Sequence, residues 1–343
     1  MGACCLKISK QYGEKGERKK FLKKDRASQL KELIASSKRK HNRSIQIFSA
    51  KELKTATNNY SYPLSFIRND GYYKLYKGYL KDQAISVMKF TKNGLEAYQQ
   101  CCNNIVYAFH MNHMNVIKLI GCCLQTRIPI LVFEAVGYGT LADRIHYRRQ
   151  PFFDRLLWTK RLNIAVEIAN AMSYLHDGFP RPVISRSITL PNILFDEQGV
   201  VKLFDFTLAT FIPEDETHVN DGVRATMRYI APEYAMTDDF NEKCDVYNFG
   251  VILLQLLIGQ EKMESSDYER IILREGLEKC LGNNKFIEIL DPIIVEDGLC
   301  LTKKKQLKDF IALALKCTSE PPEDRPTMND VAQQIRKMYQ SCI

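Results

Sequence analysis

The segment between Ile184 and Asn192 carries the side chains with the clearest bearing on chemistry. Residues 185–191 read Ser-Arg-Ser-Ile-Thr-Leu-Pro, so their polar groups are hydroxyls and one guanidinium, with no carboxylate. A serine hydroxyl stays neutral and protonated at physiological pH, whereas a general base must accept a proton to speed its step by roughly 10²- to 10⁴-fold. The segment therefore offers no general base, and the elements around it must indicate what it does.

Other short motifs follow one another in a fixed order over about residues 61 to 340. They are Val87-Met88-Lys89, Asp205-Phe206-Thr207, Ala231-Pro232-Glu233, Asp245 to Gly250, and Glu323-Asp324-Arg325-Pro326. This order resembles that of protein kinases. The resemblance implies an α+β fold of two lobes, with a small β-rich lobe over about residues 61–134 and a larger helical lobe over about 135–340.

The resemblance gives the base-free segment a role as a kinase catalytic loop. Ser187 stands where a kinase has the aspartate that accepts the substrate proton, and Thr189 stands at the lysine that steadies the transferred phosphate. Ser185 replaces the histidine of the loop. Asn104 falls where the helix of the small lobe would carry the glutamate that pairs with the active-site lysine. These four positions are predicted to be degenerate, so phosphoryl transfer is expected to be impaired.

The phosphate loop would lie just ahead of Tyr76-Lys77-Gly78, which fixes its register. Its glycine positions are then Arg68, Asp70 and Tyr73. Glycines let the backbone approach phosphates closely. Asp70 would repel the phosphates and Tyr73 adds bulk, so nucleotide binding is predicted to be weak.

Three residues keep the types that a kinase uses to hold its nucleotide. Lys89 would contact phosphates, and Asn192 and Asp205 would hold magnesium if Mg-ATP binds. We expect no required cofactor, and weak Mg-ATP binding is the alternative. Internal hydrogen bonds could equally satisfy all three side chains.

The residues between these motifs indicate a narrower family. Residues 112–124, Asn-His-Met-Asn-Val-Ile-Lys-Leu-Ile-Gly-Cys-Cys-Leu, resemble plant receptor-like kinases of the wall-associated type, as does Thr217-His218-Val219. The Met1-Gly2 start and the degenerate loop are similar to plant receptor-like cytoplasmic pseudokinases of the ZRK group. That group supplies adaptors for a coiled-coil NLR immune receptor, which report on host kinases modified by a pathogen effector. The resemblance implies such an adaptor in plant innate immunity. The alternative is an atypical, low-activity Ser/Thr protein kinase.

Residues 1–48 are predicted to form a basic tail ahead of a kinase-like domain over 49–343. Met1 to Arg43 contain 14 Lys and Arg against 4 Asp and Glu, a net charge of +10, which leaves −1 for the other 300 residues. Because the body is near charge balance, nucleic acid is not expected as a partner. The inner leaflet of the plasma membrane is the expected partner of the tail.

The tail also holds candidate lipidation sites. Gly2 could accept myristate and Cys4 or Cys5 palmitate, although Leu6 stands where the myristoylation motif prefers Ser or Thr. An acylated tail would place the protein at the cytoplasmic face of the plasma membrane. An unmodified, disordered tail of a cytoplasmic protein is the alternative.

Eleven scattered cysteines without a signal peptide indicate a reducing compartment, where most would be small buried apolar residues. The longest apolar stretch, Phe249 to Ile258, is too short to span a bilayer and is predicted to be a buried helix.

Three further helices follow from spacing. Leu30, Leu33 and Ile34 share one helix face in the tail and would either dock the receptor or pack on the small lobe. Residues 49–60 begin with a Ser49/Glu52 capping box. Apolar residues repeat at three and four from 156 to 175, which predicts a long core helix.

Structural supports are predicted at residues outside the chemistry. Asp245 would hold the backbone of the catalytic loop, and Glu233 would pair with Arg325 in a buried ion pair. Arg186, which in active kinases meets a phosphate on the activation segment, would bond to backbone carbonyls instead.

The activation segment, residues 211–228, is polar and predicted to be mobile. We expect it to order when a modified kinase docks, with Arg224 and Arg228 meeting anionic groups on that partner. A passive surface loop is the alternative.

Overall fold

The computed structural model describes residues 45–61, 66–69, 71–137, 139–146, 155–224, 226–259 and 285–341. The chain divides into two compact units. One comprises residues up to Asn112 together with Lys118–Ala135, and the other comprises His113–Ile117 and Val136–Ile343. The first unit is a sheet with helices on both faces and the second is mainly helical, in agreement with the α+β protein-kinase fold expected from the sequence.

The first unit is built on a six-stranded sheet with the order β1-β5-β6-β4-β3-β2. Its strands are β1 (Gln46–Ile47), β2 (Phe66–Asn69), β3 (Tyr73–Leu80), β4 (Gln83–Phe90), β5 (Leu119–Cys123) and β6 (Ile130–Glu134). All neighbours pair antiparallel except β1 and β5, which are parallel.

A tight turn sets the register between the two long central strands. Lys81 and Asp82 connect Leu80 of β3 to Gln83 of β4, and both turn residues have positive φ, 47° and 66°. A two-residue turn with left-handed φ at both positions matches the twist of a hairpin. The turn therefore fixes which residues of β4 lie opposite which residues of β3.

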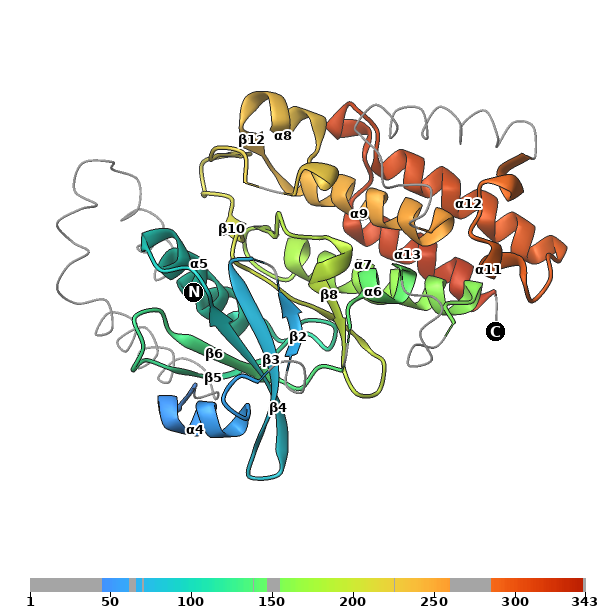
Figure 1. Cartoon of the computed structure of the whole chain (residues 1–343). Coiled ribbons are helices and arrows are strands. Elements are labelled where there is room, and N and C mark those ends of the chain that lie inside the picture. Colours follow the sequence, from blue (N-terminus) through green and yellow to red (C-terminus); the bar gives the residue numbers. More distant parts are fainter. Residues whose placement is uncertain are drawn as a thin grey trace. The chain divides into compact units, whose positions relative to one another are not determined.

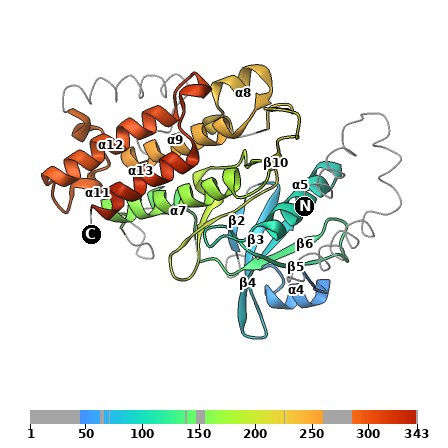
Figure 2. The same cartoon turned by 180° about the vertical axis from the view of Figure 1, so that it is seen from behind.

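Two helices cover opposite faces of this sheet (Figures 1 and 2). Helix α4 (Ala50–Ala56) has the predicted capping box, in which Ser49 and Glu52 each bond to the other's backbone N–H. Its Leu53 is buried in a cluster with Ile85 and Val87 of β4. Helix α5 (Leu95–His110) covers the other face and buries Cys101 beside Cys122 of β5.

The second unit carries helices joined by short strands and 3₁₀ turns (Figure 2). Its helices are α6 (Leu141–His146), α7 (Trp158–Asp177), α8 (Pro232–Thr237), α9 (Glu242–Ile258), α11 (Pro292–Val295), α12 (Leu301–Cys317) and α13 (Met328–Gln340). Its strands are β7 (Val183–Ile184), β8 (Ile193–Phe195), β9 (Val201–Leu203), β10 (Thr210–Phe211), β11 (Val219–Asn220) and β12 (Asp239–Phe240). The 3₁₀ turns are η1 (Leu190–Asn192), η2 (Met227–Tyr229), η3 (Lys285–Glu288) and η4 (Pro322–Asp324).

The two long helices expected from the sequence are present. Helix α7 packs against α13, and α9 packs against α12. Helix α9 begins after the cap Asn241, and nearly every residue from Cys244 to Ile258 is buried. Its apolar run is therefore core, as predicted.

The described cysteines are mostly buried and free of disulfides, as expected for small apolar residues. Burial raises the pKa of the Cys122 and Cys317 thiols to about 12. Both thiols therefore stay protonated and unreactive near neutral pH.

Arg325 and Glu233, which the sequence paired, are in contact. The Arg325 Nη1 and Nη2 atoms donate to the two carboxylate oxygens of Glu233 at 2.6 and 2.8 Å. The guanidinium is fully buried and also donates to the backbone oxygens of Ser319 and Lys243. This pair ties the start of α8 to the segment after η4.

A second buried ion pair joins residues far apart in the sequence. Arg161 of α7 meets Asp291 with 2.5 Å between Nη2 and Oδ2, and both side chains are almost fully buried. Arg161 also donates to the backbone oxygens of Leu156 and Leu256, while Asp291 accepts from the Ile293 N–H as the cap of α11. No local sequence pattern indicates this pair, because its members lie 130 positions apart.

Replacing Arg325 by Ala should lower stability by about 3 kcal/mol, because the Glu233 carboxylate keeps only part of its solvation and loses its partner. Chemical unfolding monitored by circular dichroism measures the loss. Arg155→Ala is the matched control, since the exposed Arg155–Glu296 pair has a similar 2.7 Å distance and should contribute under about 1 kcal/mol. A chemical unfolding curve of Arg325→Ala identical to that of the wild type would contradict this role.

Asp291→Asn should cost about 3 to 5 kcal/mol, since asparagine still caps a helix but leaves the Arg161 guanidinium buried without a counter-charge. Adding Arg161→Met to that variant should recover part of the loss. If the double variant is no more stable than Asp291→Asn, an orphaned charge is not the cause. Denaturant midpoints of the three proteins provide the comparison.

Candidate functional site

The catalytic-loop segment lies between β7 and η1 in the second unit, and its backbone is held by one carboxylate. Asp245 of α9 accepts the Ser185 N–H at 2.7 Å and the Arg186 N–H at 2.9 Å. His176 of α7 lies 3.3 Å from the same carboxylate, and Asp245 is completely buried. Asp245 thus fixes the loop to α9 by accepting two buried backbone N–H groups, which would otherwise lack hydrogen-bond partners.

The side chains of the loop do not supply a base. Ser185, Ser187 and Thr189 are all buried, and the Ser187 N–H points to the Ser185 hydroxyl at 3.4 Å. The place of a catalytic carboxylate is therefore occupied by an alcohol inside an ordered loop. An alcohol without an adjacent base is a poor proton acceptor.

The two candidate magnesium ligands have internal partners. Asn192 Nδ2 donates to the Ser187 carbonyl at 2.7 Å. Asp205 is held at a positive φ of 75°, and its Oδ1 accepts the Thr207 N–H at 3.0 Å. Both are buried, and both keep oxygens of the kind that magnesium prefers. Their metal-binding role stays a prediction.

Lys89 lies on the opposite face of the sheet from the one that a phosphate-binding lysine needs. A kinase lysine must reach the helix of the small lobe to pair with its glutamate. In β4, Ile85, Val87 and Lys89 share the face covered by α4, and the Lys89 Nζ lies 4.1 Å from the centre of the Tyr60 ring. The sequence predicted that Lys89 would contact phosphates, but the structure places it on the α4 face, against Tyr60. The two-residue turn at Lys81–Asp82 sets the register that turns Lys89 away from α5.

Asn104, assigned to the glutamate position, lies on α5 and is fully buried. Its Nδ2 donates to the Gln100 carbonyl at 3.3 Å. An amide carries no charge, so this position offers no ion-pair partner to a lysine.

The third glycine position of the phosphate loop is filled by a buried aromatic ring. Tyr73 is 1% exposed and packs edge-on against Phe90 at 5.9 Å between ring centres. Arg68 lies in β2, with its side chain outside the described atoms, and Asp70 lies outside the described residues. Gly71 has a φ of 90°, a conformation that favours glycine.

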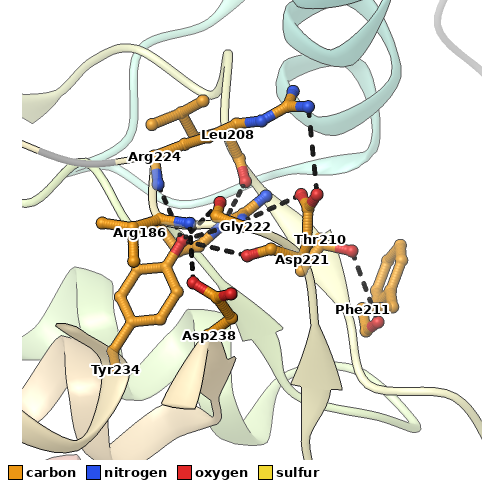
Figure 3. A network of polar contacts seen from close by, with 10 residues as sticks. Arg186, Leu208, Thr210, Phe211, Asp221, Gly222, Arg224, Tyr234 and Asp238 are labelled. Carbon is orange, nitrogen blue, oxygen red and sulfur yellow. Dashed lines mark hydrogen bonds and ion pairs between the residues drawn. The ribbon is translucent and has the colours of Figure 1, made fainter. Parts of the chain in front are cut away.

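The activation segment is tied to the catalytic loop through Arg186 (Figure 3). Arg186 donates from Nε to the Leu208 carbonyl at 2.8 Å and from Nη1 to the Asp221 carboxylate at 3.2 Å. Its guanidinium also stacks over the Phe240 ring at 4.2 Å. The expected carbonyl partner is present, and Asp221 is a partner that the sequence analysis missed.

Tyr234 of α8 anchors the same stretch (Figure 3). Its hydroxyl oxygen accepts the Arg224 N–H at 3.0 Å and lies within hydrogen-bond distance of the backbone oxygens of Asp221 and Gly222. Strand β11 also pairs with β12. Several polar groups therefore contact the stretch from Val219 to Arg224, and the mobility expected for the activation segment stays a prediction.

The two candidate partner-binding arginines, Arg224 and Arg228, lie in different parts of the activation segment and are partly exposed. Half of the Arg224 side chain is exposed, with its Nη2 atom 3.9 Å from Asp221. Arg228 lies in η2 and is half-buried. The remaining candidates, namely Gly2, Cys4, Cys5, Leu30, Leu33 and Ile34, lie outside the described residues.

Neither a metal-binding cluster nor a bilayer-spanning helix is present in the described part of the chain. No group of three or more His, Cys, Asp or Glu side chains there could hold a metal ion. None of the helices described is both long and apolar enough to cross a bilayer.

Comparison with known proteins agrees with this architecture. The family model of protein tyrosine and serine/threonine kinases matches residues 70–335. The chain is 33% identical to wall-associated receptor kinase 2 of Arabidopsis thaliana over 98% of its length and 46% of that protein. It is 34% identical to putative wall-associated receptor kinase-like 16 of the same plant, over 96% of this chain and 74% of that protein.

A third relative, wall-associated receptor kinase-like 17 of Arabidopsis thaliana, is 35% identical over 86% of this chain and 37% of its own length. The chain spans less than half the length of the first and third of these relatives. The match nevertheless covers most of this chain and both of its units. The chain belongs to the protein tyrosine and serine/threonine kinase family and is closely related to the plant wall-associated receptor kinases.

Proposed function

We propose that this chain is a kinase-fold adaptor in plant innate immunity that does not depend on phosphoryl transfer. It would link a coiled-coil NLR immune receptor to a receptor-like cytoplasmic kinase that an effector has modified. The observation that carries the proposal is Ser187, an alcohol at the base position of a loop whose backbone Asp245 still holds in place. A catalytic loop that keeps its backbone support but lacks its general base fits a protein that binds partners and does not catalyse phosphoryl transfer.

Several losses act together in support of this proposal. A general base contributes roughly 10²- to 10⁴-fold, and Ser187 cannot supply it. Thr189 cannot replace the ammonium group that steadies the transferred phosphate, and Asn104 cannot pair with a lysine. Each loss removes a separate part of the mechanism, so recovery of activity would require more than one substitution.

A low-activity Ser/Thr kinase is the second candidate. Asn192 and Asp205 favour it, since both keep the types that hold magnesium in kinases. The family match and the relatives named as receptor kinases favour it as well. Phosphoryl transfer depends chiefly on positioning and charge neutralisation, so a slow reaction without a base is chemically possible.

The activation segment is the proposed contact for the modified kinase. An activation segment can be ordered by a phosphate that an arginine binds. Here the Asp221 carboxylate meets Arg186, which leaves the segment held without any modification of this chain. Arg224 and Arg228 are the proposed donors to anionic groups on the partner.

The tail is the proposed contact for the receptor and the membrane. Leu30, Leu33 and Ile34 would supply an apolar helix face to the receptor. Acylation of Gly2 with Cys4 or Cys5, together with the basic residues, would hold the chain at the inner leaflet of the plasma membrane.

Recombinant full-length protein incubated with radiolabelled Mg-ATP should transfer no label to itself or to a generic peptide beyond the level of its Asp205→Ala variant. The reason is the missing base at Ser187. A wall-associated receptor kinase domain assayed in parallel provides the positive control. Label transfer by wild type that Asp205→Ala abolishes would favour the kinase alternative over the adaptor.

Charge reversal in the activation segment should separate the two proposed contacts. Arg224→Glu with Arg228→Glu should reduce recovery of a kinase partner by at least about tenfold, because the charge-assisted contacts become repulsive. Affinity purification from plant tissue with quantitative mass spectrometry, with and without the modifying stimulus, measures this. Recovery of the receptor should instead fall with Leu30→Glu, Leu33→Glu and Ile34→Glu.

The matched control for the arginine variant reverses two exposed lysines of α12, Lys304→Glu with Lys305→Glu. It makes the same change in net charge far from the activation segment in the sequence. Both double variants should melt as wild type does. Equal recovery of the kinase partner by the arginine variant and by this control would contradict the assigned contact.

A further inference from the structure

Adjacent residues of β4 face opposite sides of the sheet, and this decides which of them could meet a nucleotide. Side chains alternate along a strand, so Ile85, Val87 and Lys89 share one face while Met88 and Phe90 share the other. The first face is the one covered by α4, as Leu53 shows by packing in the cluster of Ile85 and Val87.

The strand register places Met88 on the α5 face. Met88 lies directly opposite Leu75 of β3 and opposite Leu131 of β6. Leu131 is in turn paired with Cys122 of β5, which lies beside Cys101 of α5. Residues directly opposite each other on paired strands point to the same face. Met88 is therefore on the side where a kinase lysine would pair with the helix.

We propose that Met88 occupies the place of the phosphate-binding lysine, and that Lys89 serves as a clamp that holds the segment after α4 on the sheet. This inference deepens the proposed function, on which it rests, by naming the residue that replaces a nucleotide ligand. It also gives the retained lysine a role that needs no nucleotide.

The α5 face of the sheet does not fit a triphosphate. Tyr73, Leu75, Met88 and Phe90 line it at the point where the phosphate loop leads into β3, and all four are buried. A phosphate needs hydrogen-bond donors or positive charge, and burial of an unpaired ion against apolar side chains is strongly unfavourable. These four side chains therefore bring no positive charge to a phosphate on this face.

The other face gives Lys89 a partner. Its Nζ atom lies 4.1 Å from the centre of the Tyr60 ring, which is within the range of a cation–π contact. The Tyr60 ring also meets Tyr76 of β3 edge-on, at 5.3 Å. Burial raises the Tyr60 pKa to about 12, so its ring stays neutral.

The backbone around Tyr60 explains why a clamp is needed. Asn58, Asn59 and Tyr60 follow α4 with φ values of 46°, 59° and 55°. A left-handed φ is uncommon for tyrosine and persists only where surrounding contacts maintain it. The Lys89 and Tyr76 contacts are in place to hold the ring, and with it the end of the α4 segment.

The test compares melting temperatures of full-length variants with and without millimolar Mg-ATP. Lys89→Met should lower the melting temperature by about 2 °C without nucleotide. Lys89→Arg keeps the cation and should therefore melt close to the wild-type temperature. Tyr60→Phe keeps the ring and should do the same. The loss in Lys89→Met should largely disappear when Tyr60→Leu is already present, because the two residues share one contact. Any shift in melting temperature on adding Mg-ATP should be the same in wild type and in Lys89→Met.

Two results would overturn the inference. One is stabilisation of wild type by Mg-ATP that Lys89→Met abolishes, since Lys89 would then be a nucleotide ligand. The other is an unchanged melting temperature for nucleotide-free Lys89→Met. Stabilisation by Mg-ATP of wild type and Lys89→Met alike, with the expected loss in the free variant, would support the clamp and weaken only the nucleotide-independent adaptor.

Discussion

The buried carboxylate of Asp245 fixes the backbone of the catalytic loop, and the other contacts of that loop depend on this support. It accepts two successive backbone N–H groups of the catalytic loop, at Ser185 and Arg186, from a fully buried position on α9. Neither bond involves a side chain that performs catalysis. The support of the loop is therefore separable from its chemistry, and the side chains at 185, 187 and 189 can change while the backbone keeps its course.

The same loop position determines how the activation segment is held. Once Asp245 fixes the Arg186 backbone, the guanidinium reaches Leu208 and Asp221 together. The Asp221 carboxylate brings a negative charge to Arg186, as a phosphate on the activation segment does in kinases regulated by phosphorylation. This contact forms without any modification of the chain.

Sequence reasoning predicted the elements whose signals are local. The Ser49/Glu52 capping box and the apolar repeat of α7 each lie within one helix, and the Glu233–Arg325 contact followed from the order of family motifs. Contacts outside those motifs were not predictable in this way. Arg161 and Asp291 are 130 positions apart, and nothing near either residue indicates the other. The face of Lys89 depends on strand register, which a turn of two residues or of three would set differently.

If the proposed adaptor role needs no nucleotide, the stability of the chain must come from its own contacts. Ligand binding to the native state raises the free energy of unfolding by mass action, and a protein that works without a ligand does not have that contribution. Buried charge in the described part of the chain is paired internally, at Arg161 with Asp291 and at Arg325 with Glu233. Lys89 follows the same pattern, since its charge lies on an aromatic ring of its own chain. Under the proposed adaptor role, Lys89 would therefore need no ligand to hold its charge, because the Tyr60 ring already faces it.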